Sequence, residues 1–360
     1  MADHAGDPLA LGQRIVGILE TGLRTATYKL ATLMALMDHC VENLPADPGD
    51  ALDVPVGDLA HRVIEIYWRQ VRPFEGHELK QSTQSVARIP QAVTELRRLA
   101  GVSRSGVSLD IAMIRVPAAY AAAVNEVELT LVQQPLHRLQ KLPGSGPSPT
   151  FLYEDSWMHD HVSRRTLEAH GGAITLYPGV AAGLARLSGL LKPALEILWV
   201  EDVRRMNRFL DADVPDVAGH LFGRERISLA PARTALKDAF GATCFYCGAA
   251  LARDSPVDHV LPWSRLGIDG LANLVLACGR CNASKLHALP SLELMDLALA
   301  RERAVLEQIA DSIEWPTQYD RVVAAARGVY RGEPEGSPMW AGVRRTTFLD
   351  LTVRPVWLEF

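Results

Sequence analysis

The sequence predicts an α+β protein in which a mainly helical N-terminal region precedes a small, metal-stabilised domain. Three observations predict this fold class. Apolar residues recur at helical spacing through most of the 360 residues, extended runs are few, and four of the five cysteines lie close together between Cys244 and Cys281. We therefore expect three parts: residues 1–225, 226–292 and 293–360.

Composition and net charge limit the kinds of protein that this chain can be. A hydrophobic content of 48% supports a buried core, and a net charge of −5 excludes a protein covered in basic surface. Any contact with nucleic acid must then come from a local patch. The N-terminus lacks the basic and apolar segments of a signal peptide, and no uncharged apolar run is long enough to cross a membrane. We expect a cytoplasmic protein with no membrane partner.

Residues 1–225 carry the apolar spacing of several helices. One helix face is marked by apolar residues in the i, i+3, i+4, i+7 pattern: Leu30, Leu33, Met34 and Met37. Two further helices are predicted to start at Asp58, a helix-capping side chain, and at Pro90, which suits the first helical position. We expect helices over 13–43 with a break at Gly22, from Asp58 onward, from Pro90 to Gly101, and between Leu109 and Gln134.

A turn or linker, "PGSGPSP" from Pro143 to Pro149, separates these helices from two short extended runs, "TFLYE" and "AITLYP". Helices followed by two strands are compatible with a winged-helix-like part over 90–180, and equally with other α+β domains. A long helix from Val180 to Leu210, interrupted or kinked near Pro193, should follow. Residues 293–360 are expected to form a helical extension with an extended tail, "RRTTFLDLTVRPVWLEF".

Two Cys-x-x-Cys pairs predict a structural zinc site, with one Zn²⁺ per chain. The four cysteines are Cys244, Cys247, Cys278 and Cys281. Four thiolates satisfy the tetrahedral preference of zinc and leave no open position for water, so this ion itself should not be catalytic. The fifth cysteine, Cys40, is expected to be a small buried apolar residue.

The residues enclosed by these cysteines resemble the HNH (ββα-metal) endonuclease family over about residues 231–290. "VDHVLPWS" is similar to the family's first strand, "LANLVLAC" to its loop and second strand, and "CGRCNASK" to the start of its helix. The steps of 14 residues from His259 to Asn273 and of 9 residues to Asn282 are similar to those in the HNH domain of RNA-guided CRISPR nucleases. The resemblance implies hydrolysis of phosphodiester bonds.

The residue types suit that chemistry. On a strand, Asp258 and His259 point to opposite faces, so one can bind a cation while the other addresses a water molecule. The oxygens of Asp258 and Asn282 suit Mg²⁺ or Mn²⁺, and the imidazole of His259 suits a general base. The resemblance further implies that Asn273 orients this imidazole through its side-chain carbonyl. Many family members have His where this chain has Asn282, so it is an HNN variant.

Three basic residues are expected to contact nucleic acid: Arg265, Arg280 and Lys285. Residues 231–290 contain six basic and four acidic residues, a balance of +2, whereas the rest of the chain carries −7. The positive balance therefore lies where the resemblance places the nuclease.

We expect a metal-dependent HNH endonuclease that acts on DNA rather than RNA, of the kind used in restriction and anti-phage defence. Residues 1–225 would target or regulate it in response to a partner protein or a small-molecule signal, and a homodimer is an open alternative. Two other functions remain open. One is a non-catalytic zinc-ribbon adaptor that binds DNA or a protein, and the other is an RNA-cleaving toxin.

Overall fold

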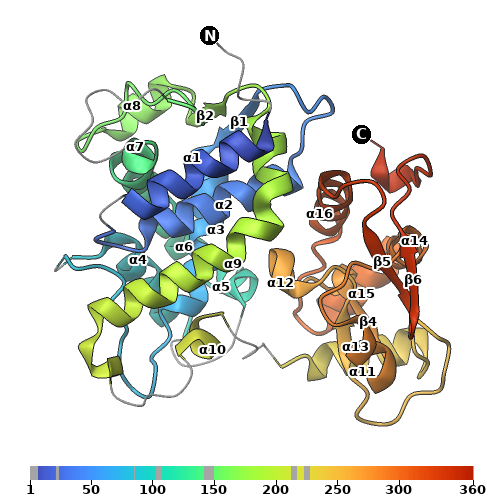
Figure 1. The fold of residues 1–360 in the computed structure, drawn as a ribbon. Coiled ribbons are helices and arrows are strands. Elements are labelled where there is room, and N and C mark those ends of the chain that lie inside the picture. Colours follow the sequence, from blue (N-terminus) through green and yellow to red (C-terminus); the bar gives the residue numbers. More distant parts are fainter. Residues whose placement is uncertain are drawn as a thin grey trace. The chain divides into compact units, whose positions relative to one another are not determined.

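The computed structural model describes residues 7–21, 24–84, 86–102, 108–141, 150–211, 217–222 and 228–359. The chain forms two compact units. The N-terminal unit contains residues 1–40 and 44–225, and the C-terminal unit contains residues 41–43 and 226–360. The α+β class is confirmed: helices dominate, and the described strands form small two-stranded sheets (Figure 1).

The N-terminal unit is a helical assembly with one small sheet. Its helices are α1 Pro8–Thr21, α2 Tyr28–Glu42, α3 Val56–Gln70, α4 Arg88–Leu99, α5 Leu109–Arg115, α6 Pro117–Gln133, α7 Pro135–Leu139, α8 Arg164–Ala169, α9 Val180–Met206 and α10 Val217–Phe222. Helix α3 buries one apolar face, which includes Leu59, Val63 and Tyr67, and packs against α4 and α6. Helix α9 packs along α1 and continues through Pro193.

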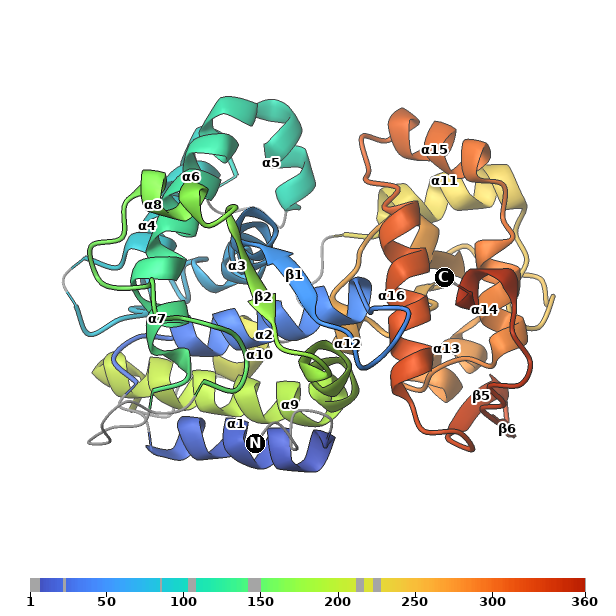
Figure 2. The same cartoon turned by 90° about the horizontal axis from the view of Figure 1, so that it is seen from above.

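The sheet of this unit joins segments far apart in the sequence. Strand β1, Leu52–Pro55, pairs antiparallel with β2, Ala173–Leu176, and Figure 2 shows the two side by side. Tyr153 adds an isolated bridge to Leu176. Strand β2 thus pairs over its length with β1, outside the segment 90–180, and by the bridge to Tyr153 within that segment. A winged-helix-like part over 90–180 stays a prediction. The predicted linker Pro143–Pro149 and the predicted break at Gly22 lie outside the described residues.

The C-terminal unit is built around a ββα arrangement. Its elements are α11 Ala230–Phe240, β3 Val257–His259, α12 Trp263–Leu266, a 3-10 helix Leu271–Asn273, β4 Leu274–Leu276, α13 Gly279–Lys285, α14 Leu292–Leu299, α15 Arg303–Ser312, α16 Tyr319–Gly332, β5 Pro338–Gly342 and β6 Arg345–Phe348. Strands β3 and β4 pair antiparallel, with Val257 opposite Leu276 and His259 opposite Leu274. Helix α13 follows β4 after two residues.

Residues 293–360 pack onto this ββα arrangement within the same compact unit. Trp340 of β5 forms a parallel bridge with Pro290, and its indole N–H donates to Ser284 Oγ of α13 over 3.0 Å. The predicted extended tail contributes β6, which pairs with the preceding strand β5, and its end packs the Trp357 ring against Tyr330 of α16. The extension therefore supports the helix that carries part of the site.

Among the described helices, none combines the length and the apolar character that a membrane span requires.

Candidate functional site

The four cysteines converge on one point of the C-terminal unit. Their Sγ atoms all lie within 4.8 Å of one another, and Cys247 Sγ is 3.9 Å from Cys278 Sγ. A tetrahedral zinc ion with Zn–S bonds of about 2.3 Å places its sulfur ligands about 3.8 Å apart. The backbone N–H of Cys281 donates to Cys278 Sγ, which lowers the pKa of that thiol to about 7. The donor set and its spacing fit zinc.

Asp258 of β3 is held by side chains from two other elements. The hydroxyl of Tyr246, which lies between the cysteines of the first pair, donates to Oδ2 of Asp258 over 2.6 Å. The ammonium of Lys285, at the end of α13, lies 3.1 Å from the same oxygen. Burial, and then the nearby Asp258 carboxylate, raise the pKa of Tyr246 well above its ordinary value, so the hydroxyl keeps the proton that it donates. The Asp258 carboxylate thus links β3 to the segment between the first two cysteines and to α13.

His259 is buried, with 2% of its surface exposed, and its two ring nitrogens have different surroundings. Nε2 lies 2.8 Å from Oδ1 of Asp269, which is in the loop before the 3-10 helix. Nδ1 is buried and has no hydrogen-bond partner among the described residues. Buried polar atoms are rarely left unpaired, and a catalytic role is one recognised reason for an exception. Nδ1 is therefore the atom of this ring with capacity to accept a proton.

Asn273 does not hold the imidazole, which corrects the expectation from the sequence. Its side-chain Oδ1 accepts from the backbone N–H of Leu261 over 2.8 Å. Its amide Nδ2 donates to the carbonyls of Leu261, over 3.1 Å, and Ile268, over 3.0 Å. The fully buried amide of Asn273 makes all of these hydrogen bonds to backbone groups. Without it, the N–H of Leu261 and the carbonyls of Leu261 and Ile268 would lose these partners. Asn273 closes that loop, and Asp269 is the residue that contacts the ring.

Two hard oxygen donors remain for a catalytic cation. In the described part of the chain no hydrogen bond engages Oδ1 of Asp258 or the side-chain amide of Asn282, whereas Oδ2 of Asp258 is taken by Tyr246 and Lys285. Asn282 precedes Lys285 by three residues on α13, and residues so spaced lie on one helix face. Asn282 therefore lies on the helix face from which Lys285 reaches Asp258. A carboxylate and an amide oxygen fit Mg²⁺ or Mn²⁺.

The three basic residues expected to contact nucleic acid have different surroundings. Arg280 is exposed near the start of α13. Arg265 forms an ion pair with Glu333, at the end of α16. Lys285 is 1% exposed and also donates to the backbone carbonyl of His259 over 2.7 Å, so its ammonium does not face a phosphate in this structure. The expectation for Lys285 is corrected because the buried carboxylate of Asp258 requires a counter-charge.

Two residues that contact the candidate site, Asp269 and Tyr246, were not predicted from the sequence. Asp269 entered only the charge balance of residues 231–290, and Tyr246 was not considered. The available signal for Asp269 was an acidic residue in the loop that connects β3 to β4. Because the two strands pair antiparallel, this loop returns to the end of β3, where His259 lies.

The N-terminal unit contains a groove of about 1040 Å³ between the end of α3, the chain after it, α4 and the end of α9, here called the α3–α4 groove. Its lining residues include Lys80, Gln81, Gln91, Thr94 and Arg205. Asn207 holds the backbone of Lys80 at both ends, by accepting from its N–H over 2.8 Å and donating to its carbonyl over 2.9 Å. The backbone at the rim of the groove is therefore fixed.

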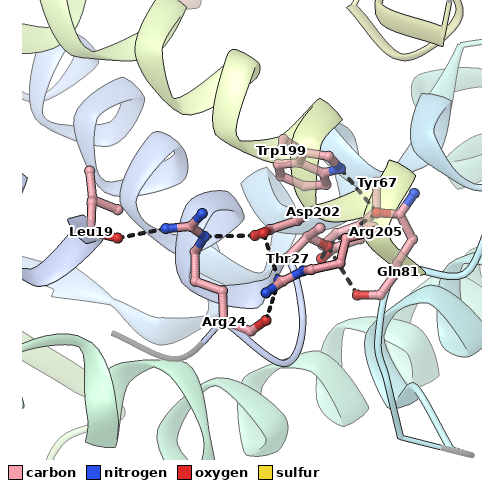
Figure 3. A network of polar contacts seen from close by, with 8 residues as sticks. All are labelled: Leu19, Arg24, Thr27, Tyr67, Gln81, Trp199, Asp202 and Arg205. Carbon is pink, nitrogen blue, oxygen red and sulfur yellow. Dashed lines mark hydrogen bonds and ion pairs between the residues drawn. The ribbon is translucent and has the colours of Figure 1, made fainter. Parts of the chain in front are cut away.

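Two of the lining residues, Gln81 and Arg205, belong to a network of polar contacts (Figure 3). Gln81 Oε1 accepts from the Trp199 indole over 3.0 Å and from the Thr27 hydroxyl over 3.2 Å. Arg205 donates to Asp202 over 2.7 Å and to the backbone carbonyl of Arg24 over 2.6 Å. Gln81 and Arg205 are thus held by partners on α9 and on the chain between α1 and α2.

Comparisons with known proteins agree with this division. The family model described as Domain of unknown function (DUF8808) matches residues 9–221, and the model described as HNH endonuclease matches residues 244–287. Neither a curated protein nor a solved structure matches the chain significantly. Together with the cysteine cluster, the second match confirms the resemblance to zinc-binding HNH domains.

Proposed function

Because the chain belongs to the family Domain of unknown function (DUF8808) and carries an HNH endonuclease domain after it, we propose that it is a metal-dependent endonuclease that hydrolyses phosphodiester bonds of DNA. The observation that carries this proposal is the pairing of two unlike groups on β3. Within the part of the chain that the structure describes, Asp258 has one carboxylate oxygen without a hydrogen-bond partner, and the next residue, His259, has one such ring nitrogen. Cation binding and proton removal are the two tasks of this reaction.

His259 acts as the general base. Nδ1 takes a proton from a water molecule as the water oxygen bonds to phosphorus, and the P–O3′ bond breaks. Asp258 and Asn282 would hold Mg²⁺ or Mn²⁺, which when bound neutralises charge on the scissile phosphate and stabilises the leaving 3′ oxygen. The leaving 3′ oxygen takes a proton from solvent water, so the products carry 5′-phosphate and 3′-hydroxyl ends. Since His259 is 2% exposed, the substrate reaches Nδ1 only when side chains over the ring move.

The test is to incubate the purified zinc-loaded chain with supercoiled plasmid, single-stranded DNA and RNA, with Mg²⁺, with Mn²⁺ and with a chelator. We expect nicking of the plasmid that needs Mg²⁺ or Mn²⁺. Cleavage of RNA alone would support the toxin alternative. Binding without cleavage under every condition would support the zinc-ribbon adaptor.

We propose that residues 1–225 target or regulate the nuclease, in a restriction or anti-phage defence role in the cytoplasm. The support is the α3–α4 groove, whose fixed polar wall suits a small-molecule signal or a segment of a partner. The domains would then be 1–225 for targeting, 226–292 for cleavage and 293–360 as a supporting extension. A homodimer is part of this proposal, because a single-metal site cuts one strand at a time.

The regulatory role is tested by filling the groove. Gln91→Trp places a large ring against the groove wall, and Arg186→Trp places the same ring at an exposed position of α9 outside it. We expect only the Gln91 variant to lose discrimination between modified and unmodified phage DNA, or between cells with and without infection, while plasmid nicking stays at the wild-type rate. Identical behaviour of the two variants would contradict a targeting role for this groove.

A further inference from the structure

We propose that Asp269 is the positioning residue of the nuclease site, where it fixes the His259 imidazole in the tautomer that leaves Nδ1 without a proton. This inference rests on the proposed function in taking His259 as the base. It assigns a role to a residue outside the three signature positions, and it explains why the imidazole is held although Asn273 does not contact it.

The geometry of the pair sets the tautomer. An ionised carboxylate only accepts hydrogen bonds, so the contact of 2.8 Å between Oδ1 of Asp269 and Nε2 of His259 places the ring proton on Nε2. A neutral imidazole has one protonated and one unprotonated nitrogen, and Nδ1 is therefore the unprotonated one. Nδ1 is also the nitrogen with no partner among the described residues. The carboxylate thus leaves the basic lone pair on Nδ1, the nitrogen that the proposed function assigns to activation of a water molecule.

The C-terminal extension holds Asp269 in place. The indole N–H of Trp315 donates to the backbone carbonyl of Asp269 over 2.8 Å. The next residue, Gly270, lies so close to the extension that an added Cβ would be 2.5 Å from Gln318 Cβ and 2.7 Å from the carbonyl oxygen of Thr317. Backbone bonds from Leu271 to Pro316, 2.8 Å, and from Ala272 to Thr317, 3.1 Å, continue the contact.

Asn273 supports the same pair from the other side. Its amide bonds Leu261, two residues after His259, and Ile268, the residue before Asp269. Asn273 therefore holds both ends of the loop that separates His259 from Asp269. Asn273 and the segment 315–318 do not contact the imidazole. They act indirectly, by fixing the backbone of the loop that carries Asp269.

The first test reads the tautomer without any reaction. The chain is labelled with ¹⁵N-histidine, and the His259 ring signals are identified as those missing from His259→Gln among the 11 histidines. In alkaline buffer without Mg²⁺ or Mn²⁺ and with the structural zinc retained, we expect the wild-type proton on Nε2. In Asp269→Asn the amide can donate to Nε2, so the proton should move wholly or partly to Nδ1. A wild-type proton on Nδ1, or an unchanged tautomer in the variant, would overturn the proposal.

The second test uses cleavage and binding together. Asp269→Asn should lower kcat by about 10²–10⁴-fold, as expected when a base is held in the wrong tautomer. Its Kd for DNA, measured without Mg²⁺ or Mn²⁺ and with zinc retained, should stay within about twofold of wild type, since Asp269 contacts the ring. Asp254→Asn removes an exposed acid of the same unit and should change neither value. Gly270→Ala should lower kcat in the same direction, because it displaces the backbone of Asp269.

The outcomes separate the two proposals. If wild-type protein cuts DNA and Asp269→Asn cuts equally fast with zinc retained, Asp269 has no positioning role. If wild-type protein cuts no substrate, the proposed function fails. The ring-proton measurement still decides whether Asp269 sets the tautomer in that case.

Discussion

The ammonium of Lys285 lies 3.1 Å from the Asp258 carboxylate, with both side chains buried in the C-terminal unit. The same ammonium donates to the backbone carbonyl of His259. A lysine that the sequence suggested as a phosphate contact is therefore an internal partner of β3, and it fixes α13 against the strand that carries the acid and the base.

Lys285→Met should destabilise the C-terminal unit by roughly 3–5 kcal/mol, because it leaves a buried carboxylate without its cation. Arg280→Met, on the exposed part of the same helix, should leave stability unchanged and weaken DNA binding, with a salt slope smaller by about one unit. Urea unfolding and DNA titration over a range of salt concentrations measure the two effects. A Lys285 variant that is fully stable but binds DNA like the Arg280 variant would restore the phosphate-contact role.

The purified chain should hold about one tightly bound zinc ion, since four converging thiols satisfy its coordination. Cys278→Ser should lose the ion and unfold the C-terminal unit, because Cys278 also caps α13 by accepting from the Cys281 N–H. Cys40→Ala, which removes a buried thiol far from the cluster in the sequence, should keep the zinc. Elemental analysis checks this, and folded, active protein without zinc would contradict it.

Tyr246→Phe separates zinc binding from support of Asp258. The zinc content should not change, because the phenol is not a ligand. The carboxylate loses a charge-assisted hydrogen bond of 2.6 Å, worth about 1.5–3 kcal/mol, and becomes less well positioned. We expect cleavage to need a higher Mg²⁺ concentration. An unaltered Mg²⁺ dependence would show that the phenol does not position Asp258.

Acid should destabilise the N-terminal unit through His39 of α2. Burial lowers the pKa of His39 to about 4 from an ordinary 6.5, an effect that Asp58 only partly opposes. The unfolded chain therefore binds a proton at a higher pH than the folded chain does. Stability is undiminished above pH 6.5 and falls by about 3 kcal/mol as the pH drops from 6.5 to 4. His39→Gln should flatten this part of the profile in urea unfolding, and an equally steep decline in the variant would exclude His39 as its cause.

The cysteine cluster and the ββα order could be predicted from the sequence because both are local. Two Cys-x-x-Cys pairs fix their own spacing, and the strands and helix of the HNH domain follow one another within about thirty residues. The helical character of the N-terminal unit was equally visible in its apolar spacing. The pairing of β1 with β2 was not, because Leu52 and Leu176 meet only through the tertiary fold.

The partners of the site residues were harder to predict for the same reason. Asp269 contacts His259 because Trp315 and Gly270 fix a loop against the C-terminal extension, and no spacing rule reports that contact. Lys285 has the pattern of a surface residue in the sequence, yet the counter-charge needed by Asp258 draws it inside. Asn273 was placed in the correct loop, but its amide bonds the backbone instead of the ring.

The most direct test of the central claim compares His259→Ala with wild-type protein on supercoiled plasmid in Mg²⁺. The account predicts that the variant keeps its zinc, its fold and its affinity for DNA within about twofold, while the nicking rate falls by about 10²–10⁴-fold. Nicking by the His259 variant at the wild-type rate would show that this imidazole is not the base, and would contradict the account at its centre.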